Sequence, residues 1–405
     1  MASVSAGDKV KGLLLRRLED NYALCNYCLY RQVSPTADVD LCTRFKSLSD
    51  SRNECNICSG LMHKMDSIIQ QIKRTLNNDY QFDTFLIGAT LPANIIERED
   101  QIRARFKIRG RENVKSHLMR DLRKKFSEVT KKQIDILHPD LTISLQFQKN
   151  TGFEINIKMR PLIMLGRYIK KNRGIPQRSG GEHNNGNEVC IQSRPYHIIG
   201  QTSRRVSGIH ILEDASIQSI ISKEILSITK GEALKLSWIG SEDENSLVLG
   251  SGRPFFIQIR NPKTIHLNQK TLCFQEYGLF VNIEEFFERL PEQPVQFIAK
   301  TRIVIQASRQ IGKEEGLKIK SLANSTVIFQ NQKDKSRLSA KRIYSIDIVK
   351  INNKIFELNV IADGGLAIKQ FVEGREYTSP SISSVANLRC NCLLFDILDI
   401  RIKEY

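Results

Sequence analysis

The sequence lacks the two features that direct a chain into or across a membrane. It contains no run of about 18 consecutive apolar residues, so no membrane-spanning helix is expected. The opening stretch MASVSAGDKVKG has no apolar core before a cleavage site, so no secretory signal is predicted either. Together these absences predict a cytoplasmic protein.

Several common catalytic signatures are also missing. The sequence has no HExxH motif, no GxSxG motif, and no glycine-rich loop followed by Gly-Lys-Ser/Thr. The C-terminal half shows no alternation of strands and helices of the βαβ kind. Metalloproteases of the HExxH type, α/β-hydrolases and P-loop nucleotide hydrolases are therefore excluded.

Acidic residues are in deficit. The chain has 44 Asp and Glu against 61 Lys and Arg, which gives a net charge of +17 and an isoelectric point near 9.5. Such an excess favours a polyanionic partner, because each phosphate that is neutralised releases counterions. A merely basic protein would have the same composition, so charge indicates nucleic acid without identifying it.

Cysteines gather near the start of the chain. Cys25-x-x-Cys28 and Cys55-x-x-Cys58 are two pairs with the spacing of metal-binding knuckles. Because cytosolic thiols are usually reduced, such pairs suggest a metal before a disulfide, and four thiolates can hold one structural Zn²⁺. A redox pair, or cysteines without a shared role, is the alternative. Two residues are spare ligands if one assignment is wrong: Cys42 and His63.

Residues 61–159 predict a small α+β module. Apolar residues recur at helical spacing over 61–76 and over 113–130, and strands alternate over 141–147 and 153–159 around a turn. A helix face that is only solvated is one interpretation of the basic residues on the second helix. The other is contact with an RNA backbone through Arg120, Arg123, Lys124 and Lys125.

The rest of the chain predicts a second domain. At 405 residues the protein can bury two or three cores. Residues 172–207 are rich in Gly, Asn, Ser and Arg, which predicts a linker or a long exposed loop. Beyond it, a hairpin over 344–351 and 354–361, a short strand over 366–371 and a closing strand over 393–400 indicate a mixed α+β domain. Its sheet is expected to be largely antiparallel.

An acidic pair is the strongest candidate for chemistry. Glu242 and Asp243 stand in a polar turn, and Gly250-Ser-Gly-Arg-Pro follows after an apolar triplet. Glycines permit tight backbone turns, and Arg253 can bind a phosphate or hold a carboxylate. From the residues alone, a surface turn and an active site are equally good interpretations.

Ordered motifs along the chain match one known family. They are Leu24-Cys-Asn-Tyr-Cys-Leu-Tyr-Arg-Gln32, Cys55-Asn-Ile-Cys-Ser-Gly-Leu61, Gly166-Arg-Tyr-Ile-Lys170 with Arg173-Gly-Ile-Pro-Gln177, the acidic segment from Gly240 to Phe255, Gly364-Gly-Leu-Ala-Ile-Lys369 and Asp396-Ile-Leu-Asp-Ile400. The sequence thus resembles the archaeal-type tRNA pseudouridine synthases that act at positions 54 and 55 of the TΨC arm. Shorter stretches resemble the THUMP-type RNA-binding domain of that family: Leu91-Pro92, Glu97-Arg-Glu99 and His138-Pro-Asp140.

The resemblance implies a fold class and a division of the chain. The class is α+β, with a zinc-binding module at 1–60 and a THUMP-like RNA-binding domain at 61–178. A linker or loop at 179–208 precedes a mixed, largely antiparallel pseudouridine synthase domain at 209–405. The implied partner is tRNA through its TΨC arm, with a structural Zn²⁺ and no catalytic cofactor. No membrane partner is expected, and nothing indicates an oligomeric state.

The resemblance also implies roles for single residues. Asp243 is the nucleophile, Lys369 is the cation that keeps it ionised, and Ile368 is an apolar wall of the uracil pocket. Glu242 is expected to point away from Asp243 and to tolerate Gln. Three basic residues are interpreted as contacts to substrate or RNA: Arg253, Arg167 and Lys170.

The chain departs from the family pattern around these residues. Ser241 stands where the family has Arg, Asn245 stands for a second Asp, and Leu247 stands for a later Arg. The tyrosine that stacks on the base is expected near residues 300–302, where the sequence reads Lys-Thr-Arg. Extra cysteine pairs after Gln177 are also missing. A catalytically weak or inactive tRNA-binding paralogue is therefore the rival hypothesis.

Overall fold

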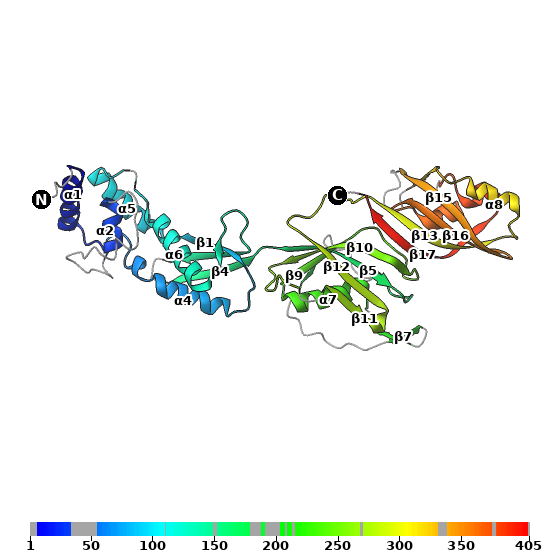
Figure 1. Ribbon diagram of the computed structural model, residues 1–405, viewed down its shortest axis with the longest axis horizontal. Coiled ribbons are helices and arrows are strands. Elements are labelled where there is room, and N and C mark those ends of the chain that lie inside the picture. Colours follow the sequence, from blue (N-terminus) through cyan, green and yellow to red (C-terminus); the bar gives the residue numbers. More distant parts are fainter. Residues whose placement is uncertain are drawn as a thin grey trace. The chain divides into compact units, whose positions relative to one another are not determined.

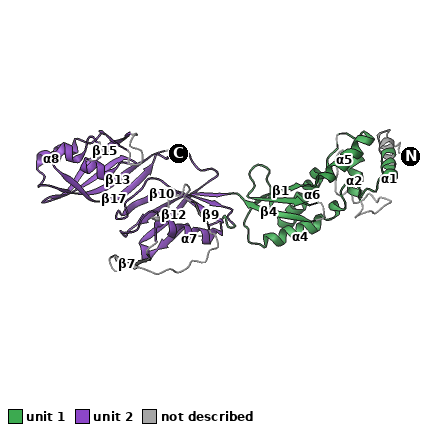
Figure 2. Cartoon of the chain, turned by 180° about the vertical axis from the view of Figure 1, so that it is seen from behind, with its two compact units in different colours: residues 1–160, 263–265 green, residues 161–262, 266–405 purple. Residues whose placement is uncertain are grey.

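The chain divides into two units, each with its own hydrophobic core (Figure 2). Unit 1 comprises residues 1–160 and 263–265, and unit 2 comprises residues 161–262 and 266–405. The structure is a computed structural model (Figure 1). It describes residues 6–33, 55–109, 111–148, 152–178, 188–190, 203–206, 209–212, 215–267, 270–330, 338–374 and 378–403.

Unit 1 begins with short helices around the cysteines. Its helices are α1 (Ala6–Asn21), α2 (Asn26–Val33), η1 (Leu61–His63), α4 (Met65–Leu76), α5 (Ala93–Phe106) and α6 (Val114–Thr130). The apolar stripe expected over 61–76 is buried, since Leu61, Met65, Ile68, Ile72 and Leu76 all lie in the core. Asn113 starts α6 by accepting a hydrogen bond from the backbone N–H of Ser116 at 2.8 Å.

The sheet of unit 1 has four strands in the order β2-β1-β3-β4. They are β1 (Thr84–Thr90), β2 (Gln133–Ile134), β3 (Leu141–Phe147) and β4 (Phe153–Met159). β1 is parallel to β2 and β3, and β3 and β4 form the expected antiparallel hairpin. α6 packs against β1, where Phe126 meets Phe85 edge to face with ring centroids 4.7 Å apart.

Unit 2 is built on one large sheet. Its main path runs β11-β12-β5-β10-β17-β13-β16-β15-β14, and β9 pairs with β10 and β6. The strands are β5 (Leu162–Lys170), β6 (Glu188–Cys190), β9 (Ala233–Trp238), β10 (Val248–Arg260), β11 (Thr271–Phe274), β12 (Leu279–Phe287), β13 (Phe297–Ala307), β14 (Thr326–Gln330), β15 (Leu338–Asn352), β16 (Ile355–Asp363) and β17 (Cys390–Ile402). A separate hairpin joins β7 (Ser203–Val206) and β8 (Ile209–Leu212).

Pairing in this large sheet is antiparallel except between β10 and β17, which meet in parallel at Val248 and Ile397. The predicted α+β class with a largely antiparallel C-terminal sheet is therefore confirmed for the described residues. β5 lies between β10 and β12, so it belongs to unit 2, although the sequence suggested a boundary near residue 178. Most of the expected linker over 179–208 lies outside the described residues.

Short helices cover parts of the sheet of unit 2. They are α7 (Ile217–Thr229), η2 (Gln275–Tyr277), α8 (Lys313–Lys320), α9 (Ile368–Glu373) and α10 (Ile382–Ala386). The strand expected over 366–371 is wrong, because this segment forms α9. Phe371 and Val372 face the core from that helix, and six residues fit helical and strand spacing equally well. No described helix is long and apolar enough to span a membrane.

Candidate active site

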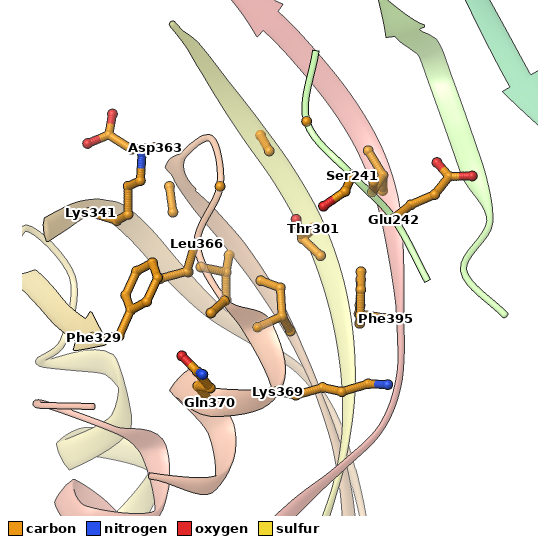
Figure 3. Close-up of a pocket in the computed structure, with 18 of the residues that line it drawn as sticks. Ser241, Glu242, Thr301, Phe329, Lys341, Asp363, Leu366, Lys369, Gln370 and Phe395 are labelled. Carbon is orange, nitrogen blue, oxygen red and sulfur yellow. The ribbon is translucent and has the colours of Figure 1, made fainter. Parts of the chain in front are cut away.

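A cavity of about 610 Å³ opens in unit 2 where the loop between β9 and β10 meets α9 (Figure 3). β13, β16 and β17 form its floor and walls. The cavity brings together residues that lie far apart in the sequence. The four residues with predicted catalytic or substrate-binding roles all line it: Asp243, Arg253, Ile368 and Lys369.

Asp243 and Lys369 form an ion pair at the rim of the cavity. The Nζ of Lys369 lies 2.7 Å from Oδ2 of Asp243, and the side chains are 58% and 29% exposed, respectively. The hydrogen bond from Lys369 holds the pKa of Asp243 below its ordinary value of 3.8. The same hydrogen bond raises the pKa of Lys369 above 10.5. A reachable carboxylate is thus kept ionised and oriented.

The buried side chain of Glu242 holds the loop that carries Asp243. Its side chain is completely buried, with Oε1 3.0 Å from Nζ of Lys170 and Oε2 3.1 Å from Nε of Arg253. The hydroxyl of Tyr168 donates a third bond to Glu242 at 2.8 Å. The two buried cations are therefore balanced in part by one carboxylate, and the sequence did not predict this role.

The same two cations bind the backbone of the loop. Nη1 and Nη2 of Arg253 donate to the carbonyls of Ile239 and Ser241 at 2.9 and 3.1 Å. Nζ of Lys170 donates to the carbonyl of Glu244 at 3.1 Å. The peptide groups on both sides of Asp243 are thus fixed by charged donors that belong to β5 and β10.

Asp396 anchors the other end of the loop. Its buried carboxylate accepts the backbone N–H of Leu247 at 2.9 Å and binds Arg173 through both oxygens at 2.6 and 2.9 Å. Arg302 lies 3.2 Å from the same carboxylate, and Arg173 also donates to the carbonyl of Asn245. Asp396 was quoted only as part of a motif, and its place in β17 explains why the loop ends where it does.

Three side chains predicted to contact substrate or RNA are bonded within the protein. Lys170 is 0% exposed and Arg253 is 2% exposed, and both are bound to Glu242. Of the two interpretations of Arg253, the structure supports the held carboxylate. Arg167 binds Glu284 and donates to Ser251 and to the carbonyls of Gly252 and Ile400, so its guanidinium is occupied within the protein. Lys170 and Arg253 thus hold the loop of Asp243, and Arg167 links neighbouring strands.

The basic face of α6 is also partly committed to internal bonds. Arg120 pairs with Glu112 and Asp121, Arg123 donates to the carbonyl of Ile87, and Lys125 pairs with Asp66. Burial lowers the pKa of Arg123. Lys124 is exposed and forms no ion pair among the described residues, so of the four expected RNA contacts it is the least engaged.

The structure shows what replaces the tyrosine expected near residue 301. Thr301 faces the cavity, and in the described part of the chain no tyrosine lines it. Arg302 is the next residue along β13, so it points to the opposite face of the sheet, where Asp396 lies. Beyond Phe297, the pocket side of β13 therefore carries the small side chains of Ala299 and Thr301.

Four cysteines of unit 1 form a buried cluster. The sulfur atoms of Cys25, Cys28, Cys55 and Cys58 all lie within 4.8 Å of one another. Burial raises the pKa of the Cys28 thiol, so a cation is what would allow these thiolates to lie together. Cys42 lies outside the described residues, and His63 is not part of the cluster. The arrangement could hold a metal ion.

A buried polar chain links this cluster to α6. Nη2 of Arg31 donates to the sulfur of Cys28 at 3.4 Å, and Arg31 also pairs with Glu99 at 2.8 Å. The other oxygen of Glu99 accepts the backbone N–H of Val114, the first residue of α6, at 2.7 Å. The position of the helix start therefore depends on the residue that contacts the cysteines.

Comparison with known families gives two matches on this chain. The model described as "Pus10, C-terminal" matches residues 162–401, and the model described as "Pus10 THUMP domain, archaeal" matches residues 68–146. The first match covers the cavity, the Asp243 loop, α9 and β17.

Curated relatives agree over nearly the whole chain. The "tRNA pseudouridine synthase Pus10" of Nitrosopumilus maritimus is 30% identical over 387 residues, which cover 94% of this chain and 96% of that protein. The protein of the same name from Cenarchaeum symbiosum is 26% identical over 395 residues, covering 96% and 92%. That of Methanocaldococcus jannaschii is 28% identical over 386 residues, covering 88% and 77%.

Glu242→Gln should destabilise unit 2, in contrast to the tolerance expected from sequence. The amide cannot balance two buried cations, and breaking a buried ion pair costs about 3–5 kcal/mol. Chemical denaturation can be followed by the fluorescence of Trp238, the one tryptophan of the chain, whose ring lies 5.7 Å from Tyr168. The exposed Glu244→Gln is the matched control and should keep the wild-type midpoint. Equal midpoints for the two variants would contradict the role given to Glu242.

Proposed function

The chain belongs to the Pus10 family of tRNA pseudouridine synthases, and from this we propose that it isomerises uridine 54, uridine 55 or both in the TΨC arm of tRNA. The observation that carries the proposal is the Asp243–Lys369 ion pair at 2.7 Å on the rim of a cavity of about 610 Å³. The carboxylate is ionised and partly exposed, and its loop is fixed at both ends.

Asp243 is the nucleophile of the proposed reaction. A uridine drawn out of the RNA stack places its glycosidic bond beside the carboxylate, which acts covalently on the nucleotide. The bond from the sugar to N1 breaks, a bond from the sugar to C5 forms, and the proton leaves C5 while N1 gains one. Because the product is an isomer, no cofactor is needed to balance the reaction.

Lys369 and Ile368 act from the start of α9. Lys369 keeps Asp243 charged and aimed at the cavity, and Ile368 lines the cavity as an apolar wall for the base. The carboxylate must remain an anion to attack, so a neighbouring cation that lowers its pKa supports this role.

tRNA binding uses the phosphate backbone. The net charge of +17 favours it, and Lys124 on α6 is the exposed cation best placed to contribute from that helix. Arg120 is 41% exposed despite its two acidic partners, and it forms a second, weaker contact.

The four clustered cysteines hold a structural Zn²⁺ in this proposal. Sulfur atoms around a tetrahedral zinc at about 2.3 Å lie roughly 3.8 Å apart. The sulfurs of Cys25 and Cys58 are 3.6 Å apart, and all four sulfurs lie within 4.8 Å of one another. The metal would neutralise thiolate charge in the core of unit 1 and would take no part in the isomerisation.

Asp243→Asn should abolish pseudouridine formation while tRNA binding persists. Asn keeps the shape of the side chain and removes the anionic oxygen, so a loss of about 10⁴-fold or more in rate is expected. Pseudouridine mapping on an unmodified tRNA transcript measures it, and Glu244→Gln is the control that should stay active. Wild-type activity in Asp243→Asn would refute the nucleophile. A wild-type protein that binds tRNA but makes no pseudouridine would establish the inactive paralogue.

The pH dependence of turnover should report the Asp243–Lys369 pair. The pKa of Asp243 is lowered, so its anion is present at and above the ordinary carboxyl pKa of 3.8 and is lost only as pH falls through the lowered value. Lys369→Met removes the hydrogen bond, which moves the acid limb of kcat/KM to higher pH. Lys341→Met removes another cation that lines the cavity without pairing with Asp243, so its limb should not move. Identical limbs in wild type and Lys369→Met would contradict the pair.

Purified, reduced protein should contain about one zinc per chain. Cys58→Ser should lose the metal and lower the thermal stability of unit 1, because the thiolate set is broken. Cys273→Ser replaces an exposed cysteine of unit 2 and should keep both. Elemental analysis with thermal unfolding checks this, and zinc-free wild-type protein of full stability would overturn the assignment.

A further inference from the structure

The cavity beside Asp243 is wide because many of its wall residues are small. Gly240, Ala299, Thr301, Gly365 and Ala367 all line it. Its volume of about 610 Å³ lies within the roughly 300–1,000 Å³ of small-molecule pockets. A flipped base is normally held between aromatic or apolar side chains, so one wall should offer such a face. Among the described residues, the aromatic side chains that line the cavity are three phenylalanines: Phe297, Phe329 and Phe395.

Phe297 is committed to the backbone of two turns. A Cβ placed on Gly364 would lie 2.3 Å from its ring, and one placed on Gly240 would lie 2.7 Å from it. The ring is therefore wedged between the loop of Asp243 and the turn that precedes α9. These contacts explain why both positions are glycine, and they leave the ring in a packing role.

Phe329 is part of the hydrophobic core. It lies on β14, is only 7% exposed, and packs in the cluster that includes Phe371 and Ile382. Its edge reaches the cavity, but most of its surface is buried among side chains of the core.

Phe395 packs against the same cluster as Phe329 but is more exposed. It is partly buried, lies on β17 opposite Ile303 of β13, and forms no ring contact with another aromatic side chain among the described residues. Ile397 is two residues further along β17 and pairs with Thr301, so Phe395, Ile397 and Thr301 share one face of the sheet. In Figure 3, Phe395 lies between Thr301 and Lys369.

We infer that Phe395 is the aromatic platform on which the target uracil stacks beside Asp243, an inference that rests on the proposed function. The family resemblance placed a stacking tyrosine near residue 301, where this chain has Thr301 instead. Because the residues of β13 and β17 are paired here, a ring on β17 can face the space that Thr301 leaves open. Phe395 has no hydroxyl, so it contributes stacking and orientation and takes no proton.

A ring-current measurement tests the platform without turnover. The probe is a synthetic TΨC-arm stem–loop with one 5-fluorouridine at position 54 or 55, bound to full-length Asp243→Asn protein. A fluorine held over an aromatic face should show an upfield ¹⁹F shift. Phe395→Leu in the same background should remove this shift, and Phe329→Leu should keep it. An absent shift, a shift that survives Phe395→Leu, or a shift lost only in Phe329→Leu would overturn the inference.

Turnover gives a second, independent readout. With Asp243 intact, Phe395→Leu should lower kcat/KM on unmodified tRNA by about 10- to 100-fold, the range expected for one lost stacking contact. Phe395→Tyr should restore it, which a merely structural loss would not explain if both variants melt like the wild type. A wild-type protein without activity that still shows the Phe395-dependent shift would refute the proposed function and leave the platform standing. Full activity of Phe395→Leu would refute the platform alone.

Discussion

One buried carboxylate decides the geometry of the loop that carries Asp243. Glu242 lies within 3.1 Å of both Lys170 and Arg253, and these cations in turn bind the carbonyls of residues 239, 241 and 244. Two cations could not be buried together without an anion between them, and the anion could not be buried without donors. The cluster therefore forms as a whole, and it leaves the next residue, Asp243, pointing outward with a free approach from the cavity.

Asp396, the second carboxylate that holds the loop, explains how distant segments of the chain meet at one site. Asp396 of β17 accepts the N–H of Leu247 and binds Arg173, which follows β5, while Arg302 reaches it from β13. The loop is thereby fixed to β17 and to the segment that follows β5. Lys369 then arrives from α9, which packs against β17. The ion pair between Lys369 and Asp243 depends on both Glu242 and Asp396. Together these two carboxylates fix the loop that carries Asp243, and so they fix the distance from Asp243 to Lys369.

Part of unit 1 could be predicted, namely α4, α6 and the hairpin of β3 and β4, because the signals of these elements are local. The apolar stripe of α4, the cap at Asn113 and the alternation of β3 and β4 are all contained in short windows of sequence. Asp243 and Lys369 came from the family resemblance, since nothing between them in sequence links a polar turn to a short helix. Contacts with RNA or substrate were predicted for Lys170 and Arg253, because a basic residue gives no local sign that its strand will lie in the middle of a sheet. α9 was taken for a strand for a similar reason, since six residues are too few to define a period.

The cations that hold the Asp243 loop bind its backbone and not its side chains, so the loop can tolerate substitutions. Arg253, Lys170 and Arg173 bind carbonyl oxygens of residues 239, 241, 244 and 245, which every amino acid provides. The side chains at 241, 244 and 245 are exposed, so substitutions there can be made without moving Asp243. Ser241 and Asn245, which differ from the family pattern, occupy two of these permissive positions. Substitution of Glu242 or of the cations around it would disturb the bonds that hold the loop, whereas substitution at 241, 244 or 245 would leave those bonds in place.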